Sequence, residues 1–125
     1  MKCFAILLAA LQLFLLAGAE LEILCTADLH GRLEKMPSLG SVLRTGGAEA
    51  LRIDCGDTGQ GSSISRHSNG KGMIALLNLF GYDVWVPGNH DFEFGRDNLL
   101  GLVRSFQGAV LAADWKEPAA GKWKL

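Results

Sequence analysis

The sequence has little net charge and no repeated or low-complexity segment, and these absences narrow the choice of function. Its 12 lysines and arginines and 13 aspartates and glutamates give a formal net charge of -1 at pH 7. Bulk electrostatics therefore favour neither a nucleic acid polymer nor a strongly acidic surface as a partner. The 125 residues are enough for about one ordinary domain.

Cysteine is also scarce, with three residues in the whole sequence. The spacing of Cys25 and Cys55 is unlike that of a zinc-binding pair, which argues against a thiolate metal site. As a disulfide they would tie two adjacent strands together, which an exported protein allows. Alternatively, both are small buried hydrophobic side chains at strand ends. We favour this second interpretation.

No hydrophobic run is long enough to be a membrane-spanning helix. Residues 4–16 are almost entirely apolar, but about 13 residues fall short of the ~20 that a bilayer requires. Lys2 precedes this run, and the small residues 17–19 follow it in the pattern of a signal-peptide cleavage site. We therefore predict a cleaved signal peptide at 1–19 rather than a membrane anchor, with export to the periplasm, the cell surface or the extracellular space.

Beyond this segment, strand-like and helix-like patterns alternate along the chain. Strands are predicted at 20–26, 50–55, 82–86 and 109–114, and helices at 37–44, 73–80 and 97–106. This β-α-β-α-β-α-β order is typical of an α/β fold with parallel strands joined by right-handed crossovers. The polar segment 62–70 is predicted to be an exposed loop, with His67 facing solvent.

Polar clusters follow the first three predicted strands, at the edge where parallel sheets bind their ligands. Asp28 and His30 follow the first strand, Asp57 the second, and Asn89 lies in a Gly-Asn-His-Asp run after the third. In extended backbone, Asp28 and His30 would point the same way. This set of hard oxygen donors with one nitrogen suits Mn²⁺, Fe, Zn²⁺ or Mg²⁺.

The same three motifs resemble a known family, the calcineurin-like metallophosphoesterases, and within it the branch of 5′-nucleotidases and 2′,3′-cyclic-nucleotide phosphodiesterases. The segments that carry the resemblance are 26–33, 54–62 and 87–95. It implies the N-terminal half of an αββα sandwich with mainly parallel strands, and residues 20–125 would form an incomplete catalytic domain.

The resemblance implies two divalent metal ions. Asp28 and His30 would bind the first ion, Asp57 would bridge both ions, and Asn89 would bind the second. The implied reaction is hydrolysis of phosphate esters, most simply nucleotides, by a hydroxide shared between the ions. Sister activities of the same fold, such as sugar-nucleotide or sulfur-ester hydrolysis, remain open.

The resemblance also assigns roles to the residues that follow Asn89. His90 would face the substrate phosphate, where it stabilises the transition state or protonates the leaving oxygen. Glu93 stands where the family often has an aspartate, and would orient the His90 imidazole. Asp91 is predicted to shape the loop rather than to bind metal.

The histidine count sets a limit on this resemblance. The sequence has three histidines, none after His90, whereas the family completes its metal sites with a lone histidine and a later G-H-x-H pair. We therefore expect the chain to be the N-terminal half of a longer metallophosphoesterase. The alternative is a non-catalytic fragment or a metal-binding half-site module.

Overall fold

The computed structural model describes residues 20–112, so the predicted signal peptide lies outside the described residues. None of the helices in this part of the chain is both long and apolar enough to span a bilayer. The elements in chain order are β1 (Ile23–Thr26), η1 (Leu33–Lys35), α2 (Met36–Leu43), β2 (Leu51–Asp54), α3 (Ser63–His67), α4 (Lys71–Leu79), β3 (Val84–Trp85), η2 (Asn89–Phe92), α5 (Arg96–Ser105) and β4 (Ala109–Val110).

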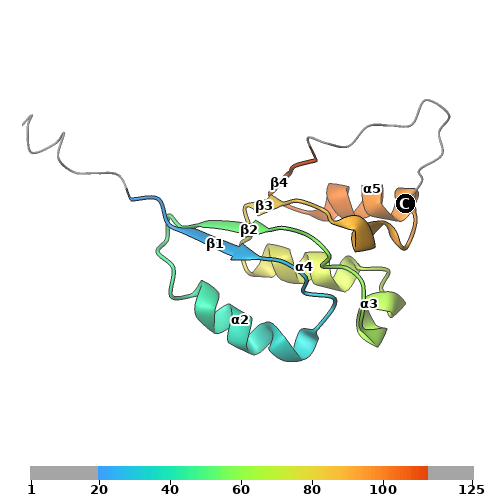
Figure 1. Ribbon diagram of the computed structural model, residues 1–125, viewed down its shortest axis with the longest axis horizontal. Coiled ribbons are helices and arrows are strands. Elements are labelled where there is room, and N and C mark those ends of the chain that lie inside the picture. Colours follow the sequence, from blue (N-terminus) through green and yellow to red (C-terminus); the bar gives the residue numbers. More distant parts are fainter. Residues whose placement is uncertain (1–19, 113–125) are drawn as a thin grey trace, which may run out of the picture.

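The four strands form one parallel sheet in the order β1-β2-β3-β4. This confirms the predicted α/β fold and its parallel strands. Because each strand is added on the same side of the previous one, right-handed crossovers bring all the connecting helices to one face. Figure 1 shows α2 and α4 together on that side of the sheet. Within the part of the chain that the structure describes, no helix covers the opposite face.

The hydrophobic core lies between this helical layer and the sheet. Trp85 of β3 is completely buried, and its ring meets that of Phe106 edge to face at a centroid distance of 6.0 Å. The helices supply apolar side chains at helical spacing, as the sequence predicts. The buried cluster consists of Leu43, Ile74, Leu77, Tyr82, Trp85, Leu99, Leu102 and Phe106.

One segment differs from its prediction. Residues 62–70 are mostly exposed, as predicted, but they contain the short helix α3 instead of forming a loop throughout. The Ser62 side chain caps this helix by accepting a hydrogen bond from the Ser65 N–H (3.1 Å). Ser65 is buried, and its hydroxyl donates to the Gly59 carbonyl. His67 is exposed, as predicted. The segment therefore packs against the loop that follows β2.

The prediction that both cysteines are buried is wrong. Thr26, Asp54 and Trp85 align across the sheet, and Trp85 points into the helix-covered core. Because side chains alternate along a strand, Cys25 points to the opposite, uncovered face. Cys25 and Cys55 are both exposed there as free thiols, and their Sγ atoms are 3.9 Å apart.

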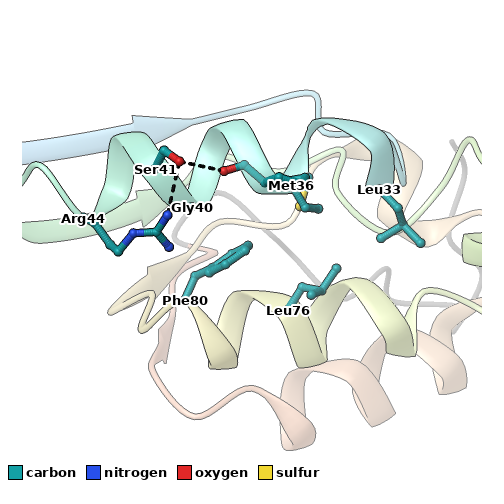
Figure 2. A pocket seen from close by; sticks show the side chains of 8 residues that line it. Leu33, Met36, Gly40, Ser41, Arg44, Leu76 and Phe80 are labelled. Carbon is teal, nitrogen blue, oxygen red and sulfur yellow. Dashed lines mark hydrogen bonds between the residues drawn. The ribbon is translucent and has the colours of Figure 1, made fainter.

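A second surface feature is an open, mostly apolar groove between α2 and α4 (Figure 2). Leu76 and Phe80 face it from the α4 side. On α2, the Ser41 hydroxyl donates to the Pro37 carbonyl (3.0 Å), and Arg44 donates to Ser41 Oγ (3.1 Å). None of the predicted ligands lines this groove, so the predicted chemistry belongs elsewhere.

Candidate metal centre

The loops that follow β1 and β2 run side by side at the carboxyl edge of the sheet. The Asp28 N–H donates to the Gly56 carbonyl (3.0 Å), and the His30 N–H donates to the Asp57 carbonyl (2.9 Å). These bonds continue the strand pairing past the end of the sheet. They also place the first two predicted clusters against each other, as the strand order requires.

The backbone at the candidate ligands is unusual. Asp28, His30 and Asp57 have φ angles of 57°, 46° and 54°, in the left-handed region that residues with a side chain normally avoid. Among the described residues, one other non-glycine residue, Asn69, has a positive φ. Such backbone costs roughly 1 kcal/mol or more per residue and gathers at functional sites. The expectation of extended backbone at Asp28 and His30 is therefore wrong.

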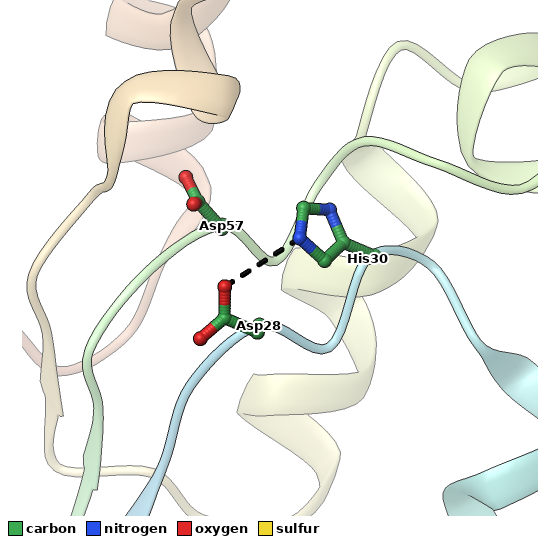
Figure 3. A group of neighbouring side chains, drawn as sticks. All are labelled: Asp28, His30 and Asp57. Atoms are coloured by element: carbon green, nitrogen blue, oxygen red, sulfur yellow. Dashed lines mark ion pairs between the residues drawn. The ribbon is translucent and has the colours of Figure 1, made fainter.

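The three side chains nevertheless converge (Figure 3). One ligand atom from each of Asp28, His30 and Asp57 lies within 4.8 Å of the other two. His30 Nε2 is 3.5 Å from Asp28 Oδ1, and the Asp28 side chain is 71% exposed, so the cluster opens to solvent. Two carboxylates and one imidazole form a donor set that fits a hard or borderline divalent cation. These residues therefore fit the predicted first metal site.

Glycines let the loop that follows β3 (the third loop) approach the loop that follows β2 (the second loop). A Cβ atom on Gly56, whose φ is +97°, would lie 2.3 Å from the Gly88 nitrogen, and one on Gly88 would lie 2.3 Å from Asp57 Oδ1. The His90 N–H donates to the same Asp57 oxygen at 2.9 Å. Asp57 thus lies where the three loops meet, and Asn89, the residue before His90, is exposed at the start of η2.

Asp91 fastens the third loop to the second. Its carboxylate is 1% exposed and accepts four backbone N–H bonds of 2.8–3.1 Å from residues on both loops. The donors are Asp57, Thr58, Gly59 and Gly88. Burial raises the pKa of this carboxyl, and the four N–H groups oppose that shift. This confirms that Asp91 shapes the loop.

His90 and Glu93 form a hydrogen-bonded pair, with the His90 Nδ1–H donating to Glu93 Oε1. This leaves Nε2 as the ring nitrogen of His90 that is available to hydrogen-bond a substrate. The bond to Glu93 is the main cause of a raised pKa at His90, and it lowers the pKa of Glu93. The His90 ring lies 5.3 Å from that of His30, centroid to centroid. The pair therefore borders the ligand cluster.

Asp54 stabilises the start of the ligand loops, which are the loops after β1, β2 and β3 that carry the candidate ligands. It is completely buried at the end of β2 and accepts hydrogen bonds from the Thr26 hydroxyl (2.6 Å), the Gly56 N–H (3.1 Å) and the Thr58 hydroxyl. Burial raises the pKa of this carboxyl. No sequence pattern indicates this role, because an aspartate at a strand end can equally well support a loop or face solvent.

Gln60 is a second residue that the sequence analysis missed. Its Oε1 accepts a hydrogen bond from His30 Nδ1 at 3.2 Å, and its side chain also hydrogen-bonds Glu93. Because a carbonyl oxygen cannot donate, this contact selects the Nδ1–H tautomer of His30. The His30 Nε2 lone pair is then directed toward the cluster. Gln60 thus connects the candidate ligand His30 to the His90–Glu93 pair.

We expect Gln60→Leu to release the His30 tautomer and to weaken Mn²⁺ binding about 10- to 100-fold, the usual cost of losing a partner of a metal-bound histidine. Nitrogen-15 NMR of His30 in the metal-free chain at alkaline pH reports the tautomer, and calorimetry reports the affinity. Gln107→Leu, at an exposed position beyond α5, is the matched control. An unchanged His30 tautomer in Gln60→Leu would contradict this role.

Comparisons with known proteins agree with this geometry. The family model for calcineurin-like phosphoesterases matches residues 21–122. The 5′-nucleotidase of Rattus norvegicus is 30% identical over 118 residues, covering 78% of this chain and 20% of the relative. A snake venom 5′-nucleotidase from Gloydius brevicauda is 32% identical over 115 residues, covering 76% of this chain and 20% of the relative.

Solved structures share the fold. The NAD nucleotidase of Haemophilus influenzae superposes with a TM-score of 0.69 at 22% identity, over 82% of this chain and 22% of that one. The calcineurin-like phosphoesterase YfkN of Bacillus subtilis gives a TM-score of 0.62 at 24% identity, over 73% of this chain and 36% of that one.

The matched region includes all three ligand loops and most of the sequence. The chain spans about a fifth of the length of the curated relatives that it matches. Their names agree with the predicted resemblance to 5′-nucleotidases. The chain belongs to the calcineurin-like phosphoesterase family.

Proposed function

We propose that this chain carries the first metal site and the substrate-facing histidine of a metal-dependent 5′-nucleotidase. The observation that carries the proposal is the convergence of Asp28, His30 and Asp57 beside the His90–Glu93 pair. Asp57 also faces the third loop, where Asn89 is the candidate ligand for a second ion. The names of the curated relatives support a nucleotide as the phosphate ester.

We assign two roles to the residues of this chain: one group would bind the metal ions, and the other would contact the substrate phosphate. When bound, divalent ions supply Lewis-acid chemistry that activates water and offsets charge on phosphate oxygens. Asp28, His30 and Asp57 would hold such ions. The raised pKa of His90 favours an imidazolium, which faces a phosphate ester through Nε2–H and donates that proton to the leaving oxygen. Glu93 holds the ring in that orientation.

A metal-binding fragment without turnover is the second candidate function. In this reading Asp28, His30 and Asp57 bind a metal ion and no phosphate ester is hydrolysed. Metal binding without hydrolysis distinguishes this fragment from the enzyme.

We also propose that residues 1–19 direct export and that the active protein is periplasmic, at the cell surface or extracellular.

The enzymatic proposal requires hydrolysis of p-nitrophenyl phosphate or AMP in the presence of Mn²⁺. In His90→Gln we expect kcat to fall about 10²- to 10⁴-fold, the usual contribution of a positioned proton donor. His67→Gln, at an exposed position on α3, is the matched control. Absence of turnover with every divalent ion, despite intact metal binding, would contradict the enzymatic proposal and favour the fragment.

The pH dependence tests Glu93 separately. Glu93 raises the pKa of His90, so the proton-donating form persists to higher pH than in an isolated imidazole. Glu93→Gln removes that effect and lowers the His90 pKa. We therefore expect the alkaline limb of the activity profile to move to lower pH, measured as kcat against pH. An alkaline limb that does not move would contradict the role of Glu93.

A further inference from the structure

The sheet face that the described helices leave uncovered carries a pair of thiols. Cys25 lies on β1, and Cys55 follows directly after β2. Both side chains are exposed and both thiols are free. They are therefore accessible to small reagents, unlike the residues of the same strands that point into the core.

The register of the sheet brings these thiols together. Cys25 is directly opposite Ile53, and Cys55 lies two residues beyond Ile53, so the cysteines are diagonal neighbours on adjacent strands. The backbone is fixed at this point by the Cys55 N–H, which donates to the Thr26 carbonyl at 2.7 Å. The 3.9 Å between the Sγ atoms exceeds a disulfide bond by about 2 Å. Rotation of the two side chains between staggered χ1 positions moves the sulfurs by such amounts.

A soft-metal site is the other use for paired thiols, and the surroundings do not supply it. The one group of potential metal ligands found in the described part of the chain contains neither cysteine. Two thiolates alone fall short of the four ligands that a structural zinc ion takes. The geometry therefore favours covalent pairing over metal binding.

We propose that Cys25 and Cys55 form a disulfide that joins β1 to β2 beneath the ligand loops. The thiolate of one cysteine attacks a low-molecular-weight disulfide such as oxidised glutathione, and one glutathione thiolate leaves. The second cysteine loses its proton and attacks the resulting mixed disulfide, forming the Cys25–Cys55 bond and releasing the other glutathione thiolate. Two electrons pass to the oxidant in total. The export proposed above provides an environment in which this bond persists.

The bond would act as a covalent tie between the two strands that carry the candidate ligands. Asp28 is three residues beyond Cys25, and Asp57 is two residues beyond Cys55. Closing the segment between the cysteines removes freedom from the unfolded chain. We expect the midpoint of thermal unfolding to rise by roughly 10 °C on oxidation.

The test is oxidation of the folded chain, in a Cys3→Ser background, with a glutathione redox buffer. Tryptic mass spectrometry should show the peptide ending at Arg32 linked to the peptide ending at Arg66, with two hydrogens lost. Cys25→Ser and Cys55→Ser should each trap one glutathione on the remaining cysteine and show no rise in the unfolding midpoint. Reduced wild type serves as the folded reference.

Two results would overturn the proposal. In the first, both cysteines of the folded chain each carry one glutathione without becoming linked. In the second, the link forms only in denaturant. Either result would show that the native backbone holds the thiols apart.

Discussion

Asp91→Asn is expected to remove a large part of the stability of this chain, although the change is isosteric and lies outside the candidate metal cluster. The carboxylate accepts four backbone N–H bonds while 1% exposed. An asparagine amide keeps one oxygen and turns an NH₂ group toward N–H donors. Buried groups left without a partner cost about 1–3 kcal/mol each. We expect a loss of roughly 3–5 kcal/mol, against typical domain stabilities of about 5–15 kcal/mol.

Urea denaturation of the two proteins measures this loss directly. Hydrogen exchange then locates it, since one pair of amides that share an Asp91 oxygen, either Thr58 and Gly59 or Asp57 and Gly88, should lose protection first. Asp97→Asn, at an exposed position in the first turn of α5, makes the same chemical change and should cost less than about 1 kcal/mol. If Asp91→Asn also costs less than 1 kcal/mol, then Asp91 does not fasten the loops together.

The sequence was sufficient to predict the sheet and the positions of the ligand loops. Alternating strand and helix patterns require parallel strands, and parallel strands bring their carboxyl ends to one edge. That argument places Asp28, Asp57 and Asn89 at the same edge without any side-chain detail. It also predicts the helical face, because the buried positions Leu99 and Leu102 follow the helical period.

Other features depend on tertiary contacts that no local pattern encodes. The left-handed backbone of Asp28 and His30 occurs together with backbone hydrogen bonds to the loop that follows β2, and this contact cannot be read from the local sequence. Gln60 meets His30 across 30 positions of sequence. Cys25 was predicted to be buried because apolar runs at strand ends usually are, but the described helices cover the other face of the sheet.

The second large effect that we expect is a loss of metal affinity in Asp57→Asn. Asp57→Asn keeps an oxygen that can accept the His90 N–H, so the loop contact should survive. It removes the central negative charge of the Asp28, His30 and Asp57 cluster. We expect affinity for Mn²⁺ to fall by more than about 100-fold, beyond the 10- to 100-fold loss typical of a residue that only supports a ligand. Urea denaturation should show nearly unchanged stability in the metal-free state.

Calorimetric titration of Mn²⁺ into the folded chain, into Asp57→Asn and into Asp97→Asn tests the metal centre most directly. It requires no substrate and no turnover, so it is independent of whether the chain is active by itself. We predict saturable binding to the wild type and to Asp97→Asn, and loss of that binding in Asp57→Asn. Absence of saturable binding to the wild type, or equal binding to all three proteins, would contradict the assignment of Asp28, His30 and Asp57 as a metal site.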